Sequence, residues 1–391
     1  MQRLAPMPLI ACVLLLAVDP AEAVDERRGG LDPVASSGRT DTEVEITDVR
    51  ALDPVGIVSP SASSPPAVPD GGDDVRILTF TGDQSARSAW MEVAENGDIY
   101  SFVLKSRTPG GDTDYLVVRS ADDGQTWQTI GVLSEIDPDL AFFSSFHVAG
   151  GDLDRVYVHY AARIGAFGSR TELRVAYADV GVEAPTWTTS VMMSVDGVDF
   201  QYGDMTDDSS EFPDAWLYAA IRGDDGDGSD IWFSRSTDGG ATWSAPFRVL
   251  EESAAPATSN FSSGYLGLVI EYGSSGQLHL GVSYSDPLTP ADREARYLRA
   301  VNYGATPANW SGTLWTLAPP AALLRVRDVA VDPVGLGLSI LIDDGLEGPR
   351  VFRSPDSGSS WSVDDVTPIT GVERIREVGW NTAGGALVVF G

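Results

Sequence analysis

The acidic stretch DDGDGSD, residues 224 to 230, spaces oxygen-bearing side chains as a calcium-binding loop does. Asp225, Asp227 and Ser229 stand two residues apart, and Ca²⁺ prefers such oxygen ligands. Loops of the EF-hand type also need glycine at position six and glutamate at position twelve, where this chain has Asp230 and a serine. A turn between strands fits the stretch as well. We therefore expect no cofactor, with calcium at Asp225, Asp227 and Asp230 as the alternative.

Histidine and cysteine indicate no further metal or thiol chemistry. His147, His159 and His279 lack the spacing of zinc ligands. Cys12 is the single cysteine, and it lies in an N-terminal segment that we expect to be removed. The mature chain then has no disulfide, so its stability must come from packing and hydrogen bonds.

A polar string recurs three times, as VRSADDGQTWQ at 118 to 128, SRSTDGGATWS at 234 to 244 and FRSPDSGSSWS at 352 to 362. In each copy, an aspartate follows the first serine by two residues, a glycine by four and a tryptophan by seven. These residues are Ser120, Asp122, Gly124 and Trp127; Ser236, Asp238, Gly240 and Trp243; and Ser354, Asp356, Gly358 and Trp361. Serine and aspartate accept backbone N–H groups in turns, and glycine permits a positive φ. We expect these three box turns to close hairpins, with the tryptophan ring packed beside each turn.

The elements around the box turns predict an all-β chain. From Val75 onward, short apolar or alternating runs are bounded by Gly, Asp and Asn. Weaker echoes of the box at Trp187 and Trp310 bring successive turn tryptophans 51 to 67 residues apart, the length of one four-stranded propeller blade. We predict a six-bladed β-propeller of four-stranded antiparallel blades. An N-terminal strand at 74 to 82 would complete the sixth blade and leave no free sheet edge.

The N-terminus predicts export. Arg3 precedes an apolar run from Pro8 to Val18, and small residues follow it, as in a signal peptide spanning 1–23. That run is shorter than the roughly 20 residues that a membrane-spanning helix needs. Residues 24–73 are rich in Pro, Ser and Asp, so we expect a disordered leader ahead of a propeller domain at 74–391. We expect a secreted or periplasmic bacterial protein.

The charge of the chain excludes two classes of partner. Its formal net charge is −31 and its pI is about 4.2, so nucleic acid and anionic membranes are repelled. The partners that remain are a glycan or a surface protein. We expect the chain to be a monomer.

The string S-x-D-x-G-x-T-W resembles the Asp-box, or BNR repeat, of sialidase-like six-bladed propellers, and the resemblance covers nearly all of 74–391. It implies a cluster of arginines that clamps a substrate carboxylate. On this resemblance the substrate-binding residues are Arg87, Arg107 and either Arg325 or Arg327. The catalytic acid would be Asp112, or alternatively Asp114.

The same resemblance leaves the nucleophile unassigned. Sialidases use a tyrosine that a glutamate activates, and the last blade, VERIREVGWNTAGG, has no tyrosine. We therefore expect a non-catalytic protein that binds a glycan or a protein through its central face. The alternative is an exo-acting glycoside hydrolase of sialidase type, cleaving terminal sialic acid or a related acidic sugar. It would need a nucleophile near the axis, for which the candidates are Tyr160, Tyr218, Tyr265, Asp204 and Glu377.

Overall fold

The computed structural model describes residues 85 to 390 with gaps. The gaps are 95, 107–112, 123, 150–154, 165–169, 181–184, 209–215, 226–228, 252–259, 262–267, 274–275, 286–292, 316–324, 333–336, 344–348, 366–376 and 382–385. The described residues fall into two compact units, the first ending at Leu133 and the second beginning at Ser134.

The first unit is one antiparallel sheet with the strand order β1-β2-β3-β4. Its strands are β1 (Ser85–Val93), β2 (Ile99–Ser106), β3 (Thr113–Ser120) and β4 (Gln128–Val132). Val103, Leu116 and Val118 form its buried cluster, against which Trp127 of the first box turn packs. The short helix α1 (Leu133–Ile136) follows β4.

The second unit repeats this pattern in successive antiparallel sheets. The first of them holds β5 (Leu140–Ala149), β6 (Arg155–Ile164), β7 (Arg170–Asp179) and β8 (Thr188–Met193). The next holds β9 (Asp199–Asp208), β10 (Trp216–Asp224), β11 (Ser229–Ser236) and β12 (Phe247–Leu250).

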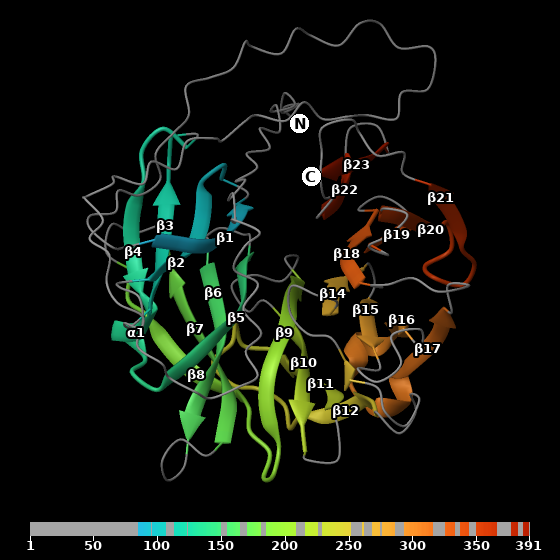
Figure 1. Cartoon of the computed structure of the whole chain (residues 1–391), viewed down its shortest axis with the longest axis horizontal. Coiled ribbons are helices and arrows are strands. Elements are labelled where there is room, and N and C mark those ends of the chain that lie inside the picture. The colour runs from blue at the N-terminus through green and yellow to red at the C-terminus, as the bar shows by residue number, and fades with distance from the viewer. Residues whose placement is uncertain are drawn as a thin grey trace, which may run out of the picture. The chain divides into compact units, whose positions relative to one another are not determined.

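The remaining sheets follow in chain order (Figure 1). One holds β13 (Asn260–Phe261), β14 (Leu268–Tyr272), β15 (Leu278–Ser285), β16 (Arg293–Ala300) and β17 (Trp310–Trp315), with 3-10 helices η6 (Asn302–Gly304) and η7 (Pro307–Asn309) between β16 and β17. Another holds β18 (Arg325–Val331), β19 (Leu338–Asp343), β20 (Pro349–Ser354) and β21 (Ser362–Asp365). The last pairs β22 (Glu377–Asn381) with β23 (Ala386–Phe390).

Within the second unit, neighbouring sheets pack face to face. Apolar clusters fill the spaces between the β5–β8 and β9–β12 sheets, between the β9–β12 and β13–β17 sheets, and between the β13–β17 and β18–β21 sheets. The leading strands of these sheets also touch in succession, with β9 against β5, β14 against β9, β18 against β14 and β22 against β18. The β9–β12 and β13–β17 sheets therefore bury both faces, which explains the apolar runs in β10 and β15.

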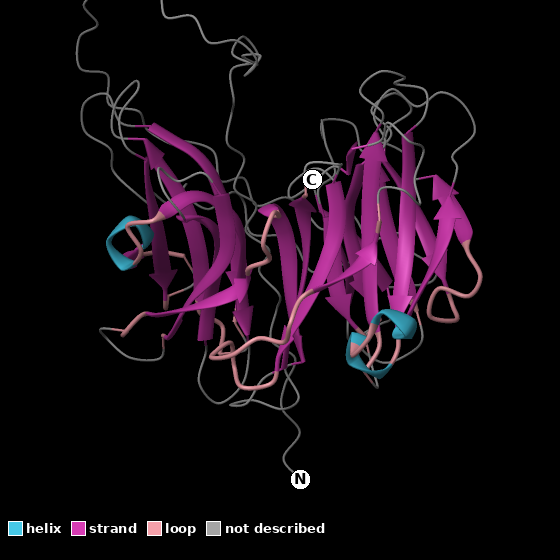
Figure 2. Ribbon diagram, turned by 90° about the horizontal axis from the view of Figure 1, so that it is seen from below, coloured by secondary structure: helices cyan, strands magenta, loops and turns pink. Residues whose placement is uncertain are grey.

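The fold is nearly all β, as the sequence predicts, and helices are confined to α1 and the two 3-10 turns in the described part of the chain (Figure 2). Several four-stranded antiparallel sheets are present. The closing strand expected at 74 to 82 lies outside the described residues, as do the leader and the signal segment. Six blades and ring closure therefore remain predictions.

All three box turns have the same hydrogen bonds. The serine hydroxyl accepts the glycine N–H, at 2.9 Å for Gly124, 2.9 Å for Gly240 and 2.7 Å for Gly358. The aspartate accepts the backbone N–H and the hydroxyl of the residue four positions on. The indole of the tryptophan donates to the glycine carbonyl. The three glycines have φ of 84°, 91° and 86°, which explains why the turn requires glycine there.

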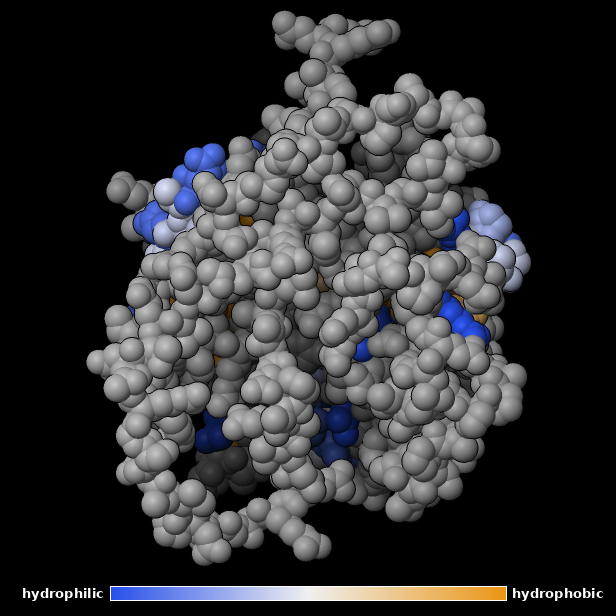
Figure 3. All heavy atoms as spheres, turned by 45° about the horizontal axis from the view of Figure 1, so that its top comes forward, coloured by the Kyte–Doolittle hydropathy of each residue, from blue (hydrophilic) through white to orange (hydrophobic). Residues whose placement is uncertain are grey.

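Hydrophilic residues are the more prominent of the described residues that are uncovered in the view of Figure 3, and hydrophobic ones show there as small patches. Val191 and Val301 are the exposed large hydrophobic residues of the described part. In that same part, no helix is long and apolar enough to cross a membrane.

Candidate functional site

Arg87 and Arg327 occupy the same place in two different sheets. β1 and β18 are each the first strand and an edge of their own sheet. In β1, Ala86 pairs with Lys105 and Ser88 with Leu104, so that Arg87 is an extra, bulged residue. In β18, Val326 pairs with Ile342 and Asp328 with Leu341, which makes Arg327 the bulged residue.

A β-bulge changes the direction of a side chain and often lies beside a binding site. The bulge in β18 also shifts the alternation of the strand, because Val326 and Val329 both face the core that this sheet shares with β13–β17. Arg327 is half-buried at this position. Of the two alternatives that the sequence left open, Arg327 and not Arg325 therefore corresponds to Arg87.

Of the other predicted binding and acid residues, the structure describes Arg325 and Asp114. Arg325 begins β18, where its backbone pairs with Asp343. Asp114 is buried in β3 and its backbone pairs with Lys105. Arg107 and Asp112 lie outside the described residues. Their roles in binding and acid catalysis therefore remain predictions.

Tyr160, a candidate nucleophile, belongs to a closed ionic network. Its hydroxyl donates to Asp137 Oδ2 at 2.6 Å. Arg174 Nη1 donates to the same oxygen at 2.9 Å, and Arg174 Nε donates to Glu172 Oε1 at 2.8 Å. The guanidinium also reaches the more exposed Asp139 at 3.3 Å.

The electrostatics of this network oppose nucleophilic chemistry. Burial raises the pKa of Tyr160, and the hydrogen bond to Asp137 raises it further. Burial alone would raise the pKa of Asp137 too, but hydrogen bonds from Tyr160 and Arg174 outweigh it, and the pKa of Asp137 is lowered. Tyr160 has no solvent exposure. Tyr160 therefore stays protonated beside an ionised carboxylate, and its hydroxyl is buried away from any substrate in solution.

Tyr218 is equally unsuited to attack a substrate. Its ring is fully buried and stacks on Tyr272, with ring centroids 5.7 Å apart and planes within 6°. Burial raises its pKa. Its hydroxyl has no hydrogen-bond partner among the described residues. Tyr218 is therefore part of the aromatic core between two sheets.

The remaining nucleophile candidates are Asp204, Glu377 and Tyr265. Asp204 Oδ2 accepts the backbone N–H of Ile270 at 3.1 Å and so joins β9 to β14. Glu377 begins β22, where its backbone pairs with Phe390. Tyr265 lies outside the described residues.

The calcium-like loop is organised by an arginine. Arg248 Nη2 donates to Asp225 Oδ2 at 2.7 Å, and Arg248 Nε lies 3.0 Å from Asp230 Oδ2. The guanidinium also stacks 5.0 Å above the ring of Trp232. Two of the three expected ligands thus already face a cation, and Asp227 lies outside the described residues. Within the described ranges, no group of three metal-ligating side chains occurs.

Sequence reasoning missed the partners of Tyr160. Glu172 and Arg174 are two residues apart on β7, so they point to the same face of the sheet. An ion pair between these two residues could have been predicted from their spacing in the strand. Asp137 comes from the connection between α1 and β5, and no spacing rule relates it to Tyr160.

Comparisons with known proteins bear on the fold. No protein-family model matches the chain, and no curated protein matches it by sequence. A mutant of the α-L-arabinofuranosidase Arb93a of Fusarium graminearum, in complex with an iminosugar inhibitor, aligns at 14% identity and a TM-score of 0.50, over 78% of this chain and 92% of that chain. The GH93 α-L-arabinofuranosidase of the same fungus, in complex with arabinobiose, aligns at 13% identity and a TM-score of 0.50, over the same shares.

At this identity the likeness shows the fold alone. The chain has the β-propeller type of architecture found in these carbohydrate-acting enzymes. The spacing of four-stranded sheets along the sequence is therefore confirmed as a propeller pattern. Membership of the sialidase-like superfamily remains a prediction.

Proposed function

We propose that this chain is an exported, non-catalytic β-propeller of sialidase-like type that binds a glycan. The observation that supports it best is the shared architecture with an arabinofuranosidase crystallised with arabinobiose, over 78% of this chain. A protein ligand on a cell surface is compatible with the same architecture. We infer that binding uses the end of the second unit at which the leading strand β18 begins, where Arg327 is bulged.

The non-catalytic part of the proposal rests on the tyrosines. A retaining or inverting hydrolase needs two opposed carboxylates, and the sialidase variant needs an accessible tyrosine. Tyr160 and Tyr218 are buried and held protonated. Asp204 is occupied by a backbone N–H. Binding without cleavage is the function that these described residues support.

An exo-acting glycoside hydrolase is the second candidate. The matching bulges at Arg87 and Arg327 favour it, because β-bulges are over-represented next to active sites. In this version Arg327 holds a substrate carboxylate through two parallel N–H donors. The substrate would be a sialoside or a related acidic sugar.

Glycan-array binding and turnover of fluorogenic sialoside and arabinofuranoside by the full chain separate these candidates. We expect binding to at least one glycan class and no turnover. Both readouts are needed, because the hydrolase is overturned only when turnover is absent too. The variant Arg327→Ala should weaken that binding about tenfold or more, the usual size of a lost bidentate pair. Arg350→Ala, in the regular strand β20, is the matched control. Turnover that Arg327→Ala abolishes would establish the hydrolase instead, and the absence of both array binding and turnover would overturn both candidates.

A further inference from the structure

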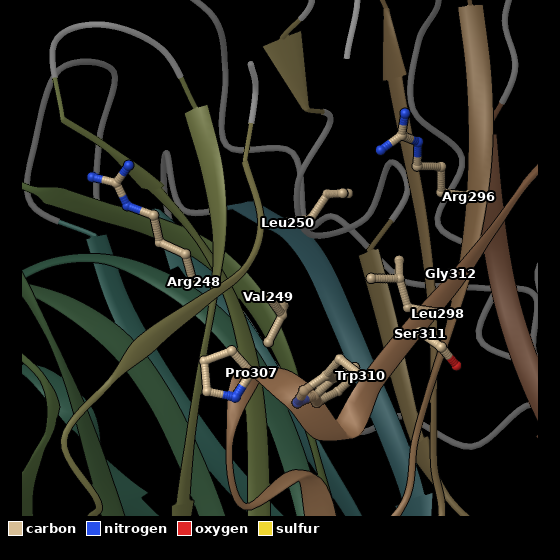
Figure 4. A pocket seen from close by; sticks show the side chains of 9 residues that line it. All are labelled: Arg248, Val249, Leu250, Arg296, Leu298, Pro307, Trp310, Ser311 and Gly312. Carbon is tan, nitrogen blue, oxygen red and sulfur yellow. The ribbon is translucent and has the colours of Figure 1, made fainter. Parts of the chain in front are cut away.

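A groove lies between the β9–β12 sheet and the β13–β17 sheet, on the side of the late strands β12, β16 and β17 (Figure 4). It has a volume of about 380 Å³, which is within the range of small-molecule sites. It is separate from the position of Arg327, because that residue lies on β18 in another sheet.

A bulge in β12 shapes one wall of the groove. Ile231 pairs with Leu250 and Trp232 with Arg248, which leaves Val249 as the extra residue. Both Val249 and Leu250 consequently pack toward the β13–β17 sheet, in the cluster that also contains Leu298. The wall is apolar because the bulge turns two consecutive side chains to one side.

Trp310 and Pro307 form the end of the groove near η7 (Figure 4). Trp310 is half-buried and its ring meets Phe233 edge to face at 5.0 Å. The Nε1 of each box tryptophan donates to a glycine carbonyl, whereas Trp310 Nε1 has no partner among the described residues. Trp310 thus keeps the edge-to-face packing on the preceding sheet that Trp361 makes with Tyr297 at 5.0 Å, but without the hydrogen bond to its own turn, and its ring lines the groove.

Arg296 supplies a charge at the other end. It lies on β16 two residues before Leu298, so both side chains belong to the face turned toward the β9–β12 sheet. In Figure 4 its guanidinium lies at the end of the groove opposite Trp310. Arg248 also lines the groove, where its guanidinium pairs with the carboxylates of Asp225 and Asp230.

The lining departs from the composition of the chain. Asp and Glu number 57 against 26 Lys and Arg in the whole sequence, yet none of the described residues that line the groove is acidic. An apolar floor with a cation at one end fits a ring that carries one carboxylate. A guanidinium offers five N–H donors, so a partner within the protein leaves others for a ligand.

We propose that this groove binds a hexuronic acid unit of a glycan, independently of what the end of β18 binds. The carboxylate would pair with Arg296, and the apolar face of the sugar ring would lie against Trp310 and Leu298. Aromatic and guanidinium groups are the side chains that carry most binding energy in such contacts. No covalent step is involved.

Calorimetric titration of the full chain with methyl β-D-glucuronide and methyl β-D-glucoside tests the proposal. We expect the glucuronide to bind more tightly than the glucoside. Arg296→Gln should weaken glucuronide binding about tenfold and leave glucoside binding unchanged. Trp310→Leu should weaken both. Arg350→Gln is the matched control, since Arg350 precedes Ser354 by four residues as Arg296 precedes Ala300.

Two results would overturn the proposal that this groove binds a hexuronic acid. One is the absence of glucuronide binding by the unaltered chain. The other is glucuronide binding that Arg296→Gln leaves intact while Arg327→Ala removes it, which would place the sugar at β18 and support the proposed function alone. Thermal unfolding of each variant by circular dichroism establishes that it is folded before it is titrated.

Discussion

The box turn from Ser236 to Trp243 and the turn from Val301 to Trp310 close the same hairpin in neighbouring sheets. The first is closed on itself, because Asp238 Oδ1 accepts the Thr242 N–H at 2.8 Å and Trp243 donates to Gly240 O at 3.1 Å. The second is built from two 3-10 turns.

The second turn satisfies its backbone by other means. Asn302 and Tyr303 both have positive φ, at 52° and 57°, an uncommon conformation for residues other than glycine. Asn309 Oδ1 accepts the Thr306 N–H and hydroxyl at 3.0 and 2.9 Å. Trp310 packs against Phe233 as Trp361 packs against Tyr297, but its Nε1 has no hydrogen-bond partner among the described residues.

The two turns also differ in how they attach to the preceding sheet. Gly239 O of the box turn accepts hydrogen bonds from Arg155 Nη1 and Tyr157 Oη, at 3.1 and 3.2 Å. In the β18–β21 sheet, Ser357 O accepts from Arg299 Nη1 and Tyr297 Oη, at 3.0 and 3.3 Å.

The turn at 301 to 310 is attached chiefly by aromatic packing. Tyr303 meets Trp216 with ring centroids 4.6 Å apart, and a longer hydrogen bond, from Arg235 Nη1 to Tyr303 O at 3.4 Å, accompanies it. The comparison shows that the box turn is held to the preceding sheet by hydrogen bonds from an arginine and a tyrosine to one of its carbonyl groups, an attachment that we call the staple. In the sheet without the box, the tryptophan keeps its packing between the sheets and loses only its hydrogen bond to the turn.

Gly358→Ala should have the largest effect. A Cβ there would overlap Tyr297 Cε1 and Oη, and the φ of 86° is strained for alanine. We expect a loss of about 3 kcal/mol in the free energy of unfolding, measured by urea denaturation. Gly240→Ala, whose Cβ would lie 3.2 Å from Tyr157 Cε1, should cost less. Equal losses at both glycines would show that the staple does not depend on this tyrosine contact.

Acid should weaken the staple and not the aromatic attachment. His279 Nδ1 lies 2.7 Å from Tyr297 Oη, and burial together with Arg299 lowers the pKa of His279 to about 4. The unfolded chain takes up a proton near pH 6.5 and the folded chain only near 4, so this stability is complete above pH 6.5 and is lost as the pH falls toward 4.

Between pH 7 and pH 5 this difference corresponds to about 2 kcal/mol. Hydrogen exchange should show faster opening of 354 to 361 at pH 5 and little change at 301 to 310. His279→Gln should reduce the pH dependence, to which the buried His159, whose pKa burial lowers to about 3, still contributes. Uniform acceleration of both turns would contradict a local role for His279.

Asp238→Ala should have an intermediate effect. The hydrogen bonds from Thr242 and Ser236 outweigh the rise that burial alone would cause, and they lower the pKa of Asp238. The site is exposed, so we expect a loss of about 1 kcal/mol in the free energy of unfolding. Asp238→Asn, which keeps an acceptor oxygen, should recover part of it. A loss with Asn as large as that with Ala would show that charge and not hydrogen bonding matters.

Asn309→Ala should have the smallest effect. It removes the acceptor of two exposed hydrogen bonds from Thr306, so we expect about 0.5 kcal/mol in chemical denaturation. The tryptophan packing should persist, and its fluorescence should not change. A loss larger than that of Asp238→Ala would reverse the ranking of the two turns.

Much of the fold was readable from the sequence because its causes are local. Strand alternation, turn residues and the spacing of Trp127, Trp243 and Trp361 predicted antiparallel sheets joined by the box turns. The hydrogen bonds of Ser236 and Asp238 followed from residue type, since acceptor and donor lie within four positions of each other.

The candidate site was predicted less well because its causes are not local. The sequence identified Arg327 only as one of two arginines on a strand, and the register of β18 against β19 was needed to distinguish it from Arg325. The sequence predicted that Tyr160 lies in a strand. It did not predict that its hydroxyl donates to Asp137, which is 23 residues earlier in the chain.

By itself, then, the sequence determined the all-β class, the acidic surface, the three box turns and the spacing of sheets, since these depend on neighbours within a few residues. Only the tertiary structure decided that Arg87 and Arg327 are bulged, that Tyr160 and Tyr218 are buried, and that Trp310 lines a groove with Arg296. The physical reason is that burial and strand register depend on packing between sheets, where the residues in contact are tens of positions apart along the chain.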